Sequence, residues 1–240
     1  MYSLRGKHVL ITGATDGLGK QTALALAKEG ANLIVHGRTE EKVTKTIEEL
    51  KKVNDSVEYI PLVCELTNSE KITEKFSIIN KLDVYINNAG IWFEGATVDT
   101  TPEKIIDLTK VNLLAPLLIT RTLLPILLKS EFSQILNVVS IAGVEIPVGY
   151  YHTAYSAVKI GLQGFTEALA KEFFNKNLRV MGYYPGGMET NFFEKAGMGY
   201  KKHEPWMFDP QESAEAIIFM LTRDKKVSVK RMDLINQLEI

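Results

Sequence analysis

Short apolar runs alternate with longer amphipathic segments along most of this 240-residue chain. An apolar run without polar alternation is typical of a strand that is covered on both faces. Between the runs, apolar residues recur three and four positions apart, which predicts helices. The expected strands cover about residues 9–11, 32–35, 59–63, 84–86, 135–139, 179–184 and 226–229, and the expected helices about residues 18–29, 40–52, 69–79, 102–129 and 154–174.

This alternation predicts a parallel sheet with helices on both of its faces. No Pro/Ser-rich linker, internal repeat or low-complexity tract interrupts the sequence, so nothing marks a boundary between domains. We therefore expect residues 1–240 to form a single doubly wound α/β domain.

Composition and charge exclude several classes of partner. Hydrophobic residues make up 45% and charged residues 24% of the chain, as in ordinary soluble proteins. The net charge of −1 gives no electrostatic attraction to nucleic acid or to an anionic membrane. The N-terminus lacks the apolar core of a signal peptide. The apolar region 111–128 is interrupted by Asn112, Pro116, Arg121 and Pro125, which indicates a buried helix. We expect a cytoplasmic protein with no nucleic-acid and no membrane partner.

Cysteine and histidine give no sign of a disulfide framework or a metal site. Cys64 is the only cysteine, which rules out an intramolecular disulfide and suits a reducing compartment. Its simplest interpretation is a small buried residue in a strand. The four histidines show no metal-ligand spacing, so no metal is expected.

The first expected strand leads into Thr12-Gly13-Ala14-Thr15-Asp16-Gly17-Leu18-Gly19, which opens the first expected helix. Glycines at such a position permit a tight turn and let a phosphate approach backbone N–H groups at the helix N-terminus. The spacing G-x-x-x-G-x-G departs from the usual dinucleotide-binding pattern. The loop also fails as the P-loop of an NTPase, because Ala14 replaces its leading glycine and Gln21 its magnesium-binding Ser/Thr. A glycine turn with purely structural duties is the alternative.

Tyr155 and Lys159 lie four positions apart in a segment expected to be helical, which places them on one face. An ammonium near a phenol favours the phenolate and lowers the pKa of the phenol. At about 4 Å and an effective dielectric constant of about 20, the attraction is about 4 kcal/mol. That would move the phenol pKa from about 10 toward neutrality. We therefore expect Tyr155 to exchange a proton near neutral pH, although an isolated Y-x-x-x-K is also common on exposed helix faces.

Together, these motifs resemble those of the short-chain dehydrogenase/reductase family over nearly the whole chain. The matches are Gly13, Gly17 and Gly19 for its cofactor loop, Asn87-Asn88-Ala89-Gly90 for the motif after its fourth strand, Asn112, Ser140, Tyr155 and Lys159 for its catalytic tetrad, and Pro185-Gly186-Gly187-Met188-Glu189-Thr190 for its P-G-x-x-x-T segment. The resemblance implies one Rossmann-type domain with a mostly parallel, seven-stranded sheet.

The resemblance assigns a role to each member of the tetrad. Tyr155 would be the general acid in carbonyl reduction and the general base in alcohol oxidation. Lys159 would lower the pKa of Tyr155 and bind the nicotinamide ribose. Ser140 would hydrogen-bond the reacting oxygen, and Asn112 would anchor a water of a proton relay. Two hydroxyl donors fit a reaction that builds negative charge on a carbonyl oxygen. Ser140 precedes Tyr155 by 15 positions, slightly more than the commonest spacing in the family.

Cofactor preference depends on the end of the second expected strand. An acidic residue there usually binds the ribose 2′-hydroxyl of NAD, whereas an arginine accommodates the 2′-phosphate of NADP. This chain has Arg38 there and no acid. We expect NADP(H) to be favoured, with NAD(H) not excluded, because Asp16 stands where NADP-preferring relatives often carry a basic residue. The alternative for Arg38 is a surface residue that balances Glu40 or Glu41.

The resemblance implies further cofactor contacts. Glu65, where the family usually has aspartate, would accept a hydrogen bond from adenine, and Met188 and Thr190 would hold the nicotinamide carboxamide. Asn87 and Asn88 could instead be turn asparagines that satisfy backbone groups. The full cofactor set is Gly13, Thr15, Asp16, Gly17, Leu18, Gly19, Arg38, Thr39, Glu65, Leu66, Asn88, Ala89, Gly90, Tyr155, Lys159, Pro185, Gly186, Met188 and Thr190.

The substrate side is less defined. The segment at about 188–210 resembles the variable substrate loop of the family, and Gly197 and Gly199 would let it move as a lid. Its aromatic residues suggest a bulky or hydrophobic carbonyl substrate, but they could equally pack against the last helix or a neighbouring subunit. His152 is expected to be a loop residue rather than a catalytic one. The residues expected near the substrate are 91–93, Tyr150, Tyr151, His152, Phe192, Phe193, Met198, Tyr200, Trp206, Met207 and Phe208.

The resemblance implies an NADP(H)-dependent oxidoreductase that interconverts a small-molecule ketone or aldehyde with an alcohol. The alternatives are an NAD-dependent alcohol or sugar dehydrogenase, a 3-oxoacyl thioester reductase, and a dinucleotide-sensing regulator without turnover. Members of the family are commonly built on their long helices, which implies a homodimer or homotetramer formed through the segments 102–129 and 154–174.

Overall fold

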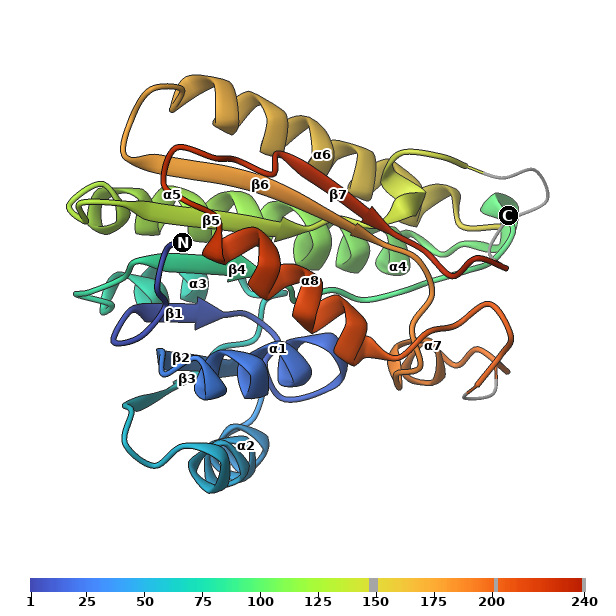
Figure 1. Cartoon of the computed structure of the whole chain (residues 1–240). Coiled ribbons are helices and arrows are strands. Elements are labelled where there is room, and N and C mark those ends of the chain that lie inside the picture. The colour runs from blue at the N-terminus through green and yellow to red at the C-terminus, as the bar shows by residue number, and fades with distance from the viewer. Residues whose placement is uncertain (147–150, 201–202, 239–240) are drawn as a thin grey trace.

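A computed structural model describes residues 1–146, 151–200 and 203–238 of the chain. Seven strands form one sheet in the order β3-β2-β1-β4-β5-β6-β7 (Figure 1), and each neighbouring pair is parallel. The strands are β1 (His8–Ile11), β2 (Asn32–Gly37), β3 (Tyr59–Val63), β4 (Val84–Asn87), β5 (Ser133–Val138), β6 (Leu178–Pro185) and β7 (Arg231–Leu234). The expected parallel, doubly wound sheet is confirmed.

Helices cover both faces of the sheet (Figure 1). They are α1 (Gly17–Lys28), α2 (Glu40–Val53), α3 (Ser69–Ser77), α4 (Pro102–Thr109), α5 (Ala115–Leu127), α6 (Thr153–Glu172), α7 (Phe192–Lys195) and α8 (Pro210–Thr222). Helices α1 and α8 share one core with Ile11 and Val35, whereas α3, α5 and α6 share the other with Leu10 and Ile34. Successive strand side chains point to opposite faces, so apolar runs are needed to fill both cores.

The segment expected to be one helix over 102–129 is interrupted by a π-helical turn at Lys110–Leu114, between α4 and α5. Pro116 has no N–H to donate to the carbonyl of Asn112, four residues earlier, which disfavours a continuous α-helix at this place. The turn carries Asn112 at the junction of the two helices.

The same stretch, Pro102–Leu127, is long and apolar enough to cross a membrane by length and composition alone. Core helices of soluble proteins pass the same test, and Ala115, Ile119 and Leu123 of α5 are buried in the core of this molecule. The apolar character of α5 is therefore accounted for by the sheet that it covers.

The last strand lies later in the chain than the sequence predicts. The β-branched run at 226–229 forms no strand, and β7 (Arg231–Leu234) pairs with β6 instead. In β7, exposed Arg231 and Asp233 alternate with half-buried Met232 and Leu234, the pattern of an edge strand with one solvated face. The carbonyl of Val227 accepts a hydrogen bond from the Arg179 guanidinium, which fixes the earlier run as a loop.

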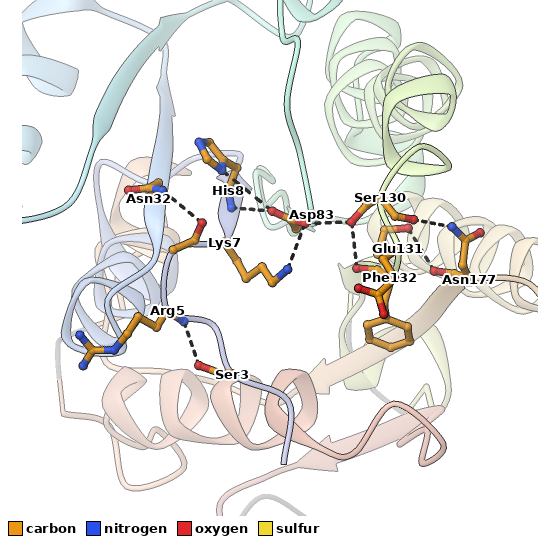
Figure 2. Close-up of polar contacts among 12 residues, drawn as sticks. Ser3, Arg5, Lys7, His8, Asn32, Asp83, Ser130, Glu131, Phe132 and Asn177 are labelled. Carbon is orange, nitrogen blue, oxygen red and sulfur yellow. Dashed lines mark hydrogen bonds and ion pairs between the residues drawn. The ribbon is translucent and has the colours of Figure 1, made fainter.

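Asp83 ties the amino ends of the central strands together (Figure 2). Its carboxylate accepts hydrogen bonds from the backbone N–H of His8 and from the Ser130 hydroxyl, each at 2.9 Å, and Lys7 Nζ lies 3.6 Å away. The side-chain amide of Asn177 donates to the Ser130 carbonyl. Only 12% of the Asp83 side chain is exposed, so these protein groups replace most of its water. The cluster connects β1, β4 and the turn before β5.

Candidate active site

A cleft of about 1480 Å³ runs along the carboxyl edge of the sheet. Strands β1 and β4 are neighbours in the sheet but not in the sequence, and the loops that follow such strands diverge and open a crevice. The cleft exceeds the roughly 300–1,000 Å³ of ordinary small-molecule pockets, so it has room for a dinucleotide and a second molecule. Every residue of the expected cofactor set lines it, and so does Ser140, whereas Asn112 does not.

The glycine loop between β1 and α1 has little room for side chains. Gly13 (φ +66°) and Gly17 (φ +49°) are left-handed, a conformation that favours glycine. A Cβ at Gly19 would lie 2.2 Å from the Gly13 carbonyl oxygen, so no larger residue fits there without moving the loop. Asp16 caps α1 through the Gly17 N–H at 2.8 Å and also pairs with Lys195 of α7 across the cleft. The carboxylate of Asp16 is therefore balanced by two positive partners.

Asn88 supports this loop with its side chain. The Asn88 amide donates to the carbonyl oxygens of Thr12 (2.8 Å) and Gly13 (3.3 Å), and the Thr12 hydroxyl accepts from the backbone N–H groups of Asn88 and Ala89. Asn87 is buried and donates to Asn137 on β5 at 3.2 Å. Both side chains thus satisfy groups of the fold, Asn87 from the end of β4 itself and Asn88 from the residue that follows it.

Positive charge gathers at the end of β2. Arg38 lines the cleft together with Lys42 and Lys45 from the start of α2. Within the part of the chain that the structure describes, Arg38 makes no ion pair with Glu40 or Glu41. The interpretation of Arg38 as a partner of these surface acids therefore has no support, and the guanidinium is available to an anion in the cleft.

Tyr155 and Lys159 lie on the buried face of α6, each 4% exposed. The expectation that Lys159 lowers the pKa of Tyr155 is wrong for this arrangement. Burial raises the pKa of Tyr155, opposed only by a hydrogen bond with Ser140, and burial lowers the pKa of Lys159 to about 7. Lys159 Nζ donates to the Val138 carbonyl at 3.1 Å and lies 5.6 Å from the centre of the Tyr155 ring. Desolvation thus disfavours the charged form of both groups.

The Asn112 side chain is hydrogen-bonded to the backbone of Ile91. Its side-chain oxygen accepts from the Ile91 N–H at 2.9 Å, and its amide donates to the Ile91 carbonyl at 2.8 Å. A Cβ at Gly90 would lie 3.1 Å from the same Asn112 oxygen. The π-helical turn thus holds the segment that follows β4 against the cleft.

Aromatic rings form the wall of the cleft beyond Tyr155. Trp92 lies 4.3 Å from Tyr155 and 5.2 Å from Phe193 between ring centres, and Phe193 in turn lies 5.4 Å from Trp206. Trp206 can approach because residue 187 is glycine, where a Cβ would lie 2.1 Å from the indole ring. The aromatic side chains therefore pack on one another and line the cleft, as expected of a pocket. The lining rings of this wall are Trp92, Phe192, Phe193, Tyr200 and Trp206.

The other residues expected near the substrate are distributed unevenly. His152 is buried, lies 2.7 Å from the Ser156 hydroxyl through Nδ1 and lines the cleft. Tyr151 is 61% exposed and is not among the lining residues, and neither are Met198, Met207 and Phe208. Tyr150 lies outside the described residues. No group of three His, Cys, Asp or Glu residues in the described parts of the chain could hold a metal ion.

The family model for short chain dehydrogenase matches residues 7–201. The chain belongs to the short-chain dehydrogenase family. It is therefore an oxidoreductase that acts on hydroxyl or carbonyl groups with a nicotinamide cofactor. A curated relative, the NADP-dependent 3-hydroxy acid dehydrogenase of Schizosaccharomyces pombe, is 35% identical over 95% of this chain and 92% of its own length.

Solved structures of short-chain dehydrogenases have the same fold. An alcohol dehydrogenase from Thermococcus sibiricus in complex with 5-hydroxy-NADP superposes with a TM-score of 0.86 and 25% identity, over 97% of each chain. A short chain dehydrogenase from Escherichia coli in complex with NADPH gives a TM-score of 0.85 and 25% identity, over 96% of this chain and 98% of that one.

The cleft of this short-chain dehydrogenase fits a dinucleotide. Gly17, Leu18 and Gly19 line the cleft at the N-terminus of α1, where the helix dipole favours a pyrophosphate. Gly90, Ala89 and Gly13 line the adjoining stretch with little more than backbone. The cationic end of β2 suits a phosphate on the ribose.

Sequence reasoning missed several residues that border this cleft. His36, at the end of β2, bonds the glycine loop, and a histidine two residues before Arg38 was the only signal. Ile235 and Leu238, from the tail after β7, line the cleft. Between them, the Asn236 amide donates to the carbonyl oxygens of Pro205 (3.1 Å) and Met207 (2.8 Å) and holds the loop before α8. These contacts join distant parts of the chain, so the local sequence pattern does not reveal them.

Proposed function

We propose that the protein is an NADP(H)-dependent oxidoreductase that interconverts a ketone or aldehyde with an alcohol, with Tyr155 as the proton donor and acceptor. The observation that carries the proposal is the convergence of Tyr155, Ser140 and Lys159 on one wall of a cleft that also contains a glycine loop. These groups come from α6 and from the segment after β5. The nicotinamide, when bound, supplies or accepts the hydride.

Tyr155 and Ser140 would act on the oxygen of the substrate. Carbonyl reduction builds negative charge on this oxygen, and two hydroxyl donors fixed in a buried site stabilise that charge without rearranging. Because burial raises the pKa of Tyr155, the phenol is protonated near neutral pH, the form that a general acid requires.

Lys159 would take part through its position behind Tyr155. With its pKa lowered to about 7, Lys159 gains or loses a proton close to neutral pH. It would bind the nicotinamide ribose and replenish the proton that Tyr155 transfers. Both polar atoms of the Asn112 side chain are hydrogen-bonded to the Ile91 backbone. The relay water would therefore be held by the backbone carbonyl of Asn112. In an α-helix that carbonyl would accept from residue 116, but Pro116 has no N–H.

The preference for NADP(H) is supported by the charges at both ends of the pyrophosphate region. Arg38 and Lys42 offer positive charge where a 2′-phosphate would lie. The objection raised by Asp16 weakens, because Lys195 and the N-terminus of α1 balance its carboxylate. The relatives whose names or titles mention NADP or NADPH agree with this preference.

The substrate would be a carbonyl compound with a bulky apolar portion, which the wall of Trp92, Phe193 and Trp206 would contact. A 3-hydroxy acid belongs among the first compounds to try, because the Schizosaccharomyces pombe relative is named for that class. The outer face of α6 exposes Ala157, Ile160 and Gly164, a surface suited to helix packing between two copies. We expect a homodimer or homotetramer by light scattering.

The decisive experiment is a panel of aldehydes, ketones, 3-hydroxy acids and alcohols with both cofactors, run beside Tyr155→Phe. This variant keeps the ring that packs on Trp92 and removes the proton. We expect kcat to fall about 10²–10⁴-fold, the usual contribution of general acid–base catalysis, while the Kd for NADP⁺ stays within about threefold. Tyr151→Phe, at an exposed tyrosine, is the control and should keep the parent rate.

Two outcomes would contradict this proposal in different ways. A Tyr155→Phe variant as fast as the parent would remove Tyr155 from the mechanism. NADPH binding by fluorescence without turnover of any compound would favour a dinucleotide-sensing regulator.

A further inference from the structure

His36 occupies a buried position between two loops that border the cleft. It is 1% exposed at the end of β2. Its Nδ1 accepts a hydrogen bond from the backbone N–H of Gly13 at 3.1 Å, and its Nε2 lies 3.0 Å from the Cys64 carbonyl oxygen. Gly13 begins the glycine loop, and Cys64 directly precedes Glu65. One imidazole therefore bridges the loop after β1 and the loop after β3.

The partners of the ring determine its protonation. A backbone N–H can only donate, so Nδ1 must carry a lone pair, and a carbonyl can only accept, so Nε2 must carry the proton. Only the neutral Nε2–H tautomer satisfies both. A proton on Nδ1 would place two donors, Gly13 N–H and His36 N–H, against each other without an acceptor.

The surroundings of the ring favour this neutral form. Phe76 of α3 lies 5.6 Å from it between ring centres, and the thiol of its partner residue Cys64 stays neutral because burial raises the thiol pKa. No charged side chain of the described residues contributes to the pKa of His36, which burial lowers to about 4 against the hydrogen bond with Cys64. Imidazole is therefore neutral here over the whole physiological range.

His36 bonds the start of the glycine loop, where the phosphates of the cofactor would bind. The next N–H, that of Ala14, donates to the His36 carbonyl oxygen at 2.9 Å, so both the backbone and the side chain of His36 hold the start of the loop. The adjacent Gly37 packs against Thr15 of the same loop, since a Cβ there would lie 2.6 Å from the Thr15 methyl. Arg38 follows directly. The end of β2 thus supports the phosphate loop from behind and presents Arg38 to the cleft.

We propose that His36 is a positioning residue for the dinucleotide: as the neutral Nε2–H tautomer, it holds Gly13 and Cys64 so that the glycine loop is already in the shape that receives the phosphates. This role rests on the proposed use of NADP(H). It requires no contact between His36 and the cofactor. A preformed loop lowers the ordering cost of binding, so the role is expressed in affinity and not in the chemical step.

The test compares His36→Leu, His36→Gln and, as a matched control, His8→Leu. Leucine fills a similar volume but neither donates nor accepts, whereas the glutamine amide can do both. His8 is also buried, with its pKa lowered by burial, but it lies at the amino edge of the same sheet beside Asp83 (Figure 2). For each protein, the Kd for NADP⁺ is measured by calorimetry, kcat at saturating cofactor, and stability by urea unfolding.

We expect His36→Leu to raise the Kd for NADP⁺ about 10–100-fold, the size of one lost buried hydrogen bond, with kcat changed less than about threefold. His36→Gln should recover at least half of that loss on a logarithmic scale. His8→Leu should lose stability and keep the parent Kd within about twofold. An unchanged Kd in His36→Leu, or an equal rise in His8→Leu, would overturn the proposal.

A spectroscopic measurement on the unmodified protein covers the case in which His36→Leu fails to fold. Two-bond ¹H–¹⁵N spectra distinguish the two neutral tautomers and the imidazolium. We expect His36 to be the Nε2–H tautomer at pH 7 and to remain so at pH 5. An Nδ1–H tautomer, or titration near the ordinary histidine pKa of about 6.5, would overturn the bridge. If the parent protein does not bind NADP⁺, the proposed function fails, whereas the spectra still decide on the bridge.

Discussion

The two edges of the sheet both contain a buried histidine and a polar cluster, yet their hydrogen bonds end differently. At the amino edge, the Asp83 carboxylate accepts hydrogen bonds from the His8 backbone N–H and the Ser130 hydroxyl, so these bonds join parts of the fold to one another (Figure 2). At the carboxyl edge, His36 and Asn88 bond the glycine loop, but the N-terminus of α1 and Arg38 face the cleft. Hydrogen bonds between buried groups of the fold contribute to its stability. Hydrogen bonds that position the groups lining a cleft contribute to ligand binding.

The comparison yields predictions in which a substitution at one edge should change stability and a substitution at the other should change binding. The largest effect is expected at Asp83. Asp83→Ala would leave the His8 N–H and the Ser130 hydroxyl buried without their acceptor, which should lower the free energy of unfolding by about 3 kcal/mol. Urea unfolding measures this loss, and the Kd for NADP⁺ of the folded protein should stay within about twofold.

Asp83→Asn is the graded control, since it keeps one acceptor oxygen and should recover part of the lost stability. A large rise in the Kd for NADP⁺ in either variant, with stability unchanged, would erase the distinction between the two edges.

Arg38→Ala is expected to have the next largest effect, and on binding alone. Loss of one charge-assisted contact should raise the Kd for NADP⁺ about 10–100-fold while leaving the Kd for NAD⁺ within about threefold. Calorimetry with both cofactors measures this split. The free energy of unfolding should change by less than about 0.5 kcal/mol, because Arg38 is an exposed residue.

Arg121→Ala, at another exposed arginine, controls for the loss of one positive charge and should affect neither cofactor. Comparable kcat/KM values for NADPH and NADH in the parent, unchanged by Arg38→Ala, would defeat the NADP preference.

The smallest effect is expected at Asn236, which joins the C-terminal tail to the substrate loop. Asn236→Ala removes the bonds to the Pro205 and Met207 carbonyl oxygens, so the loop should become less ordered. We expect the KM for the carbonyl substrate to rise about 3–10-fold, corresponding to about one net hydrogen bond, with an unchanged Kd for NADP⁺.

Asn32 provides the matched control at the amino edge, where its side chain also makes two backbone contacts, with Gly6 and Glu58. Asn32→Ala should lower stability and leave KM unchanged. If Asn32→Ala raised KM as much as Asn236→Ala, the tail would have no special relation to the substrate.

Much of the fold follows from local pattern. Six of the seven strands lie within two residues of the positions that the apolar runs predict, because a strand buried on both faces has no alternative pattern. The exception, β7, is an edge strand, and its exposed Arg231 and Asp233 hide it from a search for apolar runs. The β-branched residues at 226–229 predict a strand that does not form, because β-propensity depends on the surroundings of a residue.

The site was predictable where a motif specifies it and unpredictable where it depends on burial or on distant contacts. The cofactor set lines a single cleft, as the loops after consecutive strands require. The sequence predicts a lowered pKa for Tyr155, whereas burial raises it. The spacing to Lys159 can be read from the sequence, but the degree of desolvation cannot. His36 and Asn236 act through bonds to residues 23 and about 30 positions away, which no local pattern encodes.

The adjacency of β1 and β4 links the folding of the chain to the binding of its cofactor. Val9 pairs with Val84, and the cleft is bordered by Gly13 near one end of the chain and by Leu238 near the other. Such distant pairings close late and slowly during folding, so a partly folded chain has no complete binding cleft. A dinucleotide therefore binds only the finished molecule, and a hundredfold excess over its Kd would add about 2.7 kcal/mol to the stability of that state. The supply of cofactor in the cell would then influence how long each copy of the protein survives.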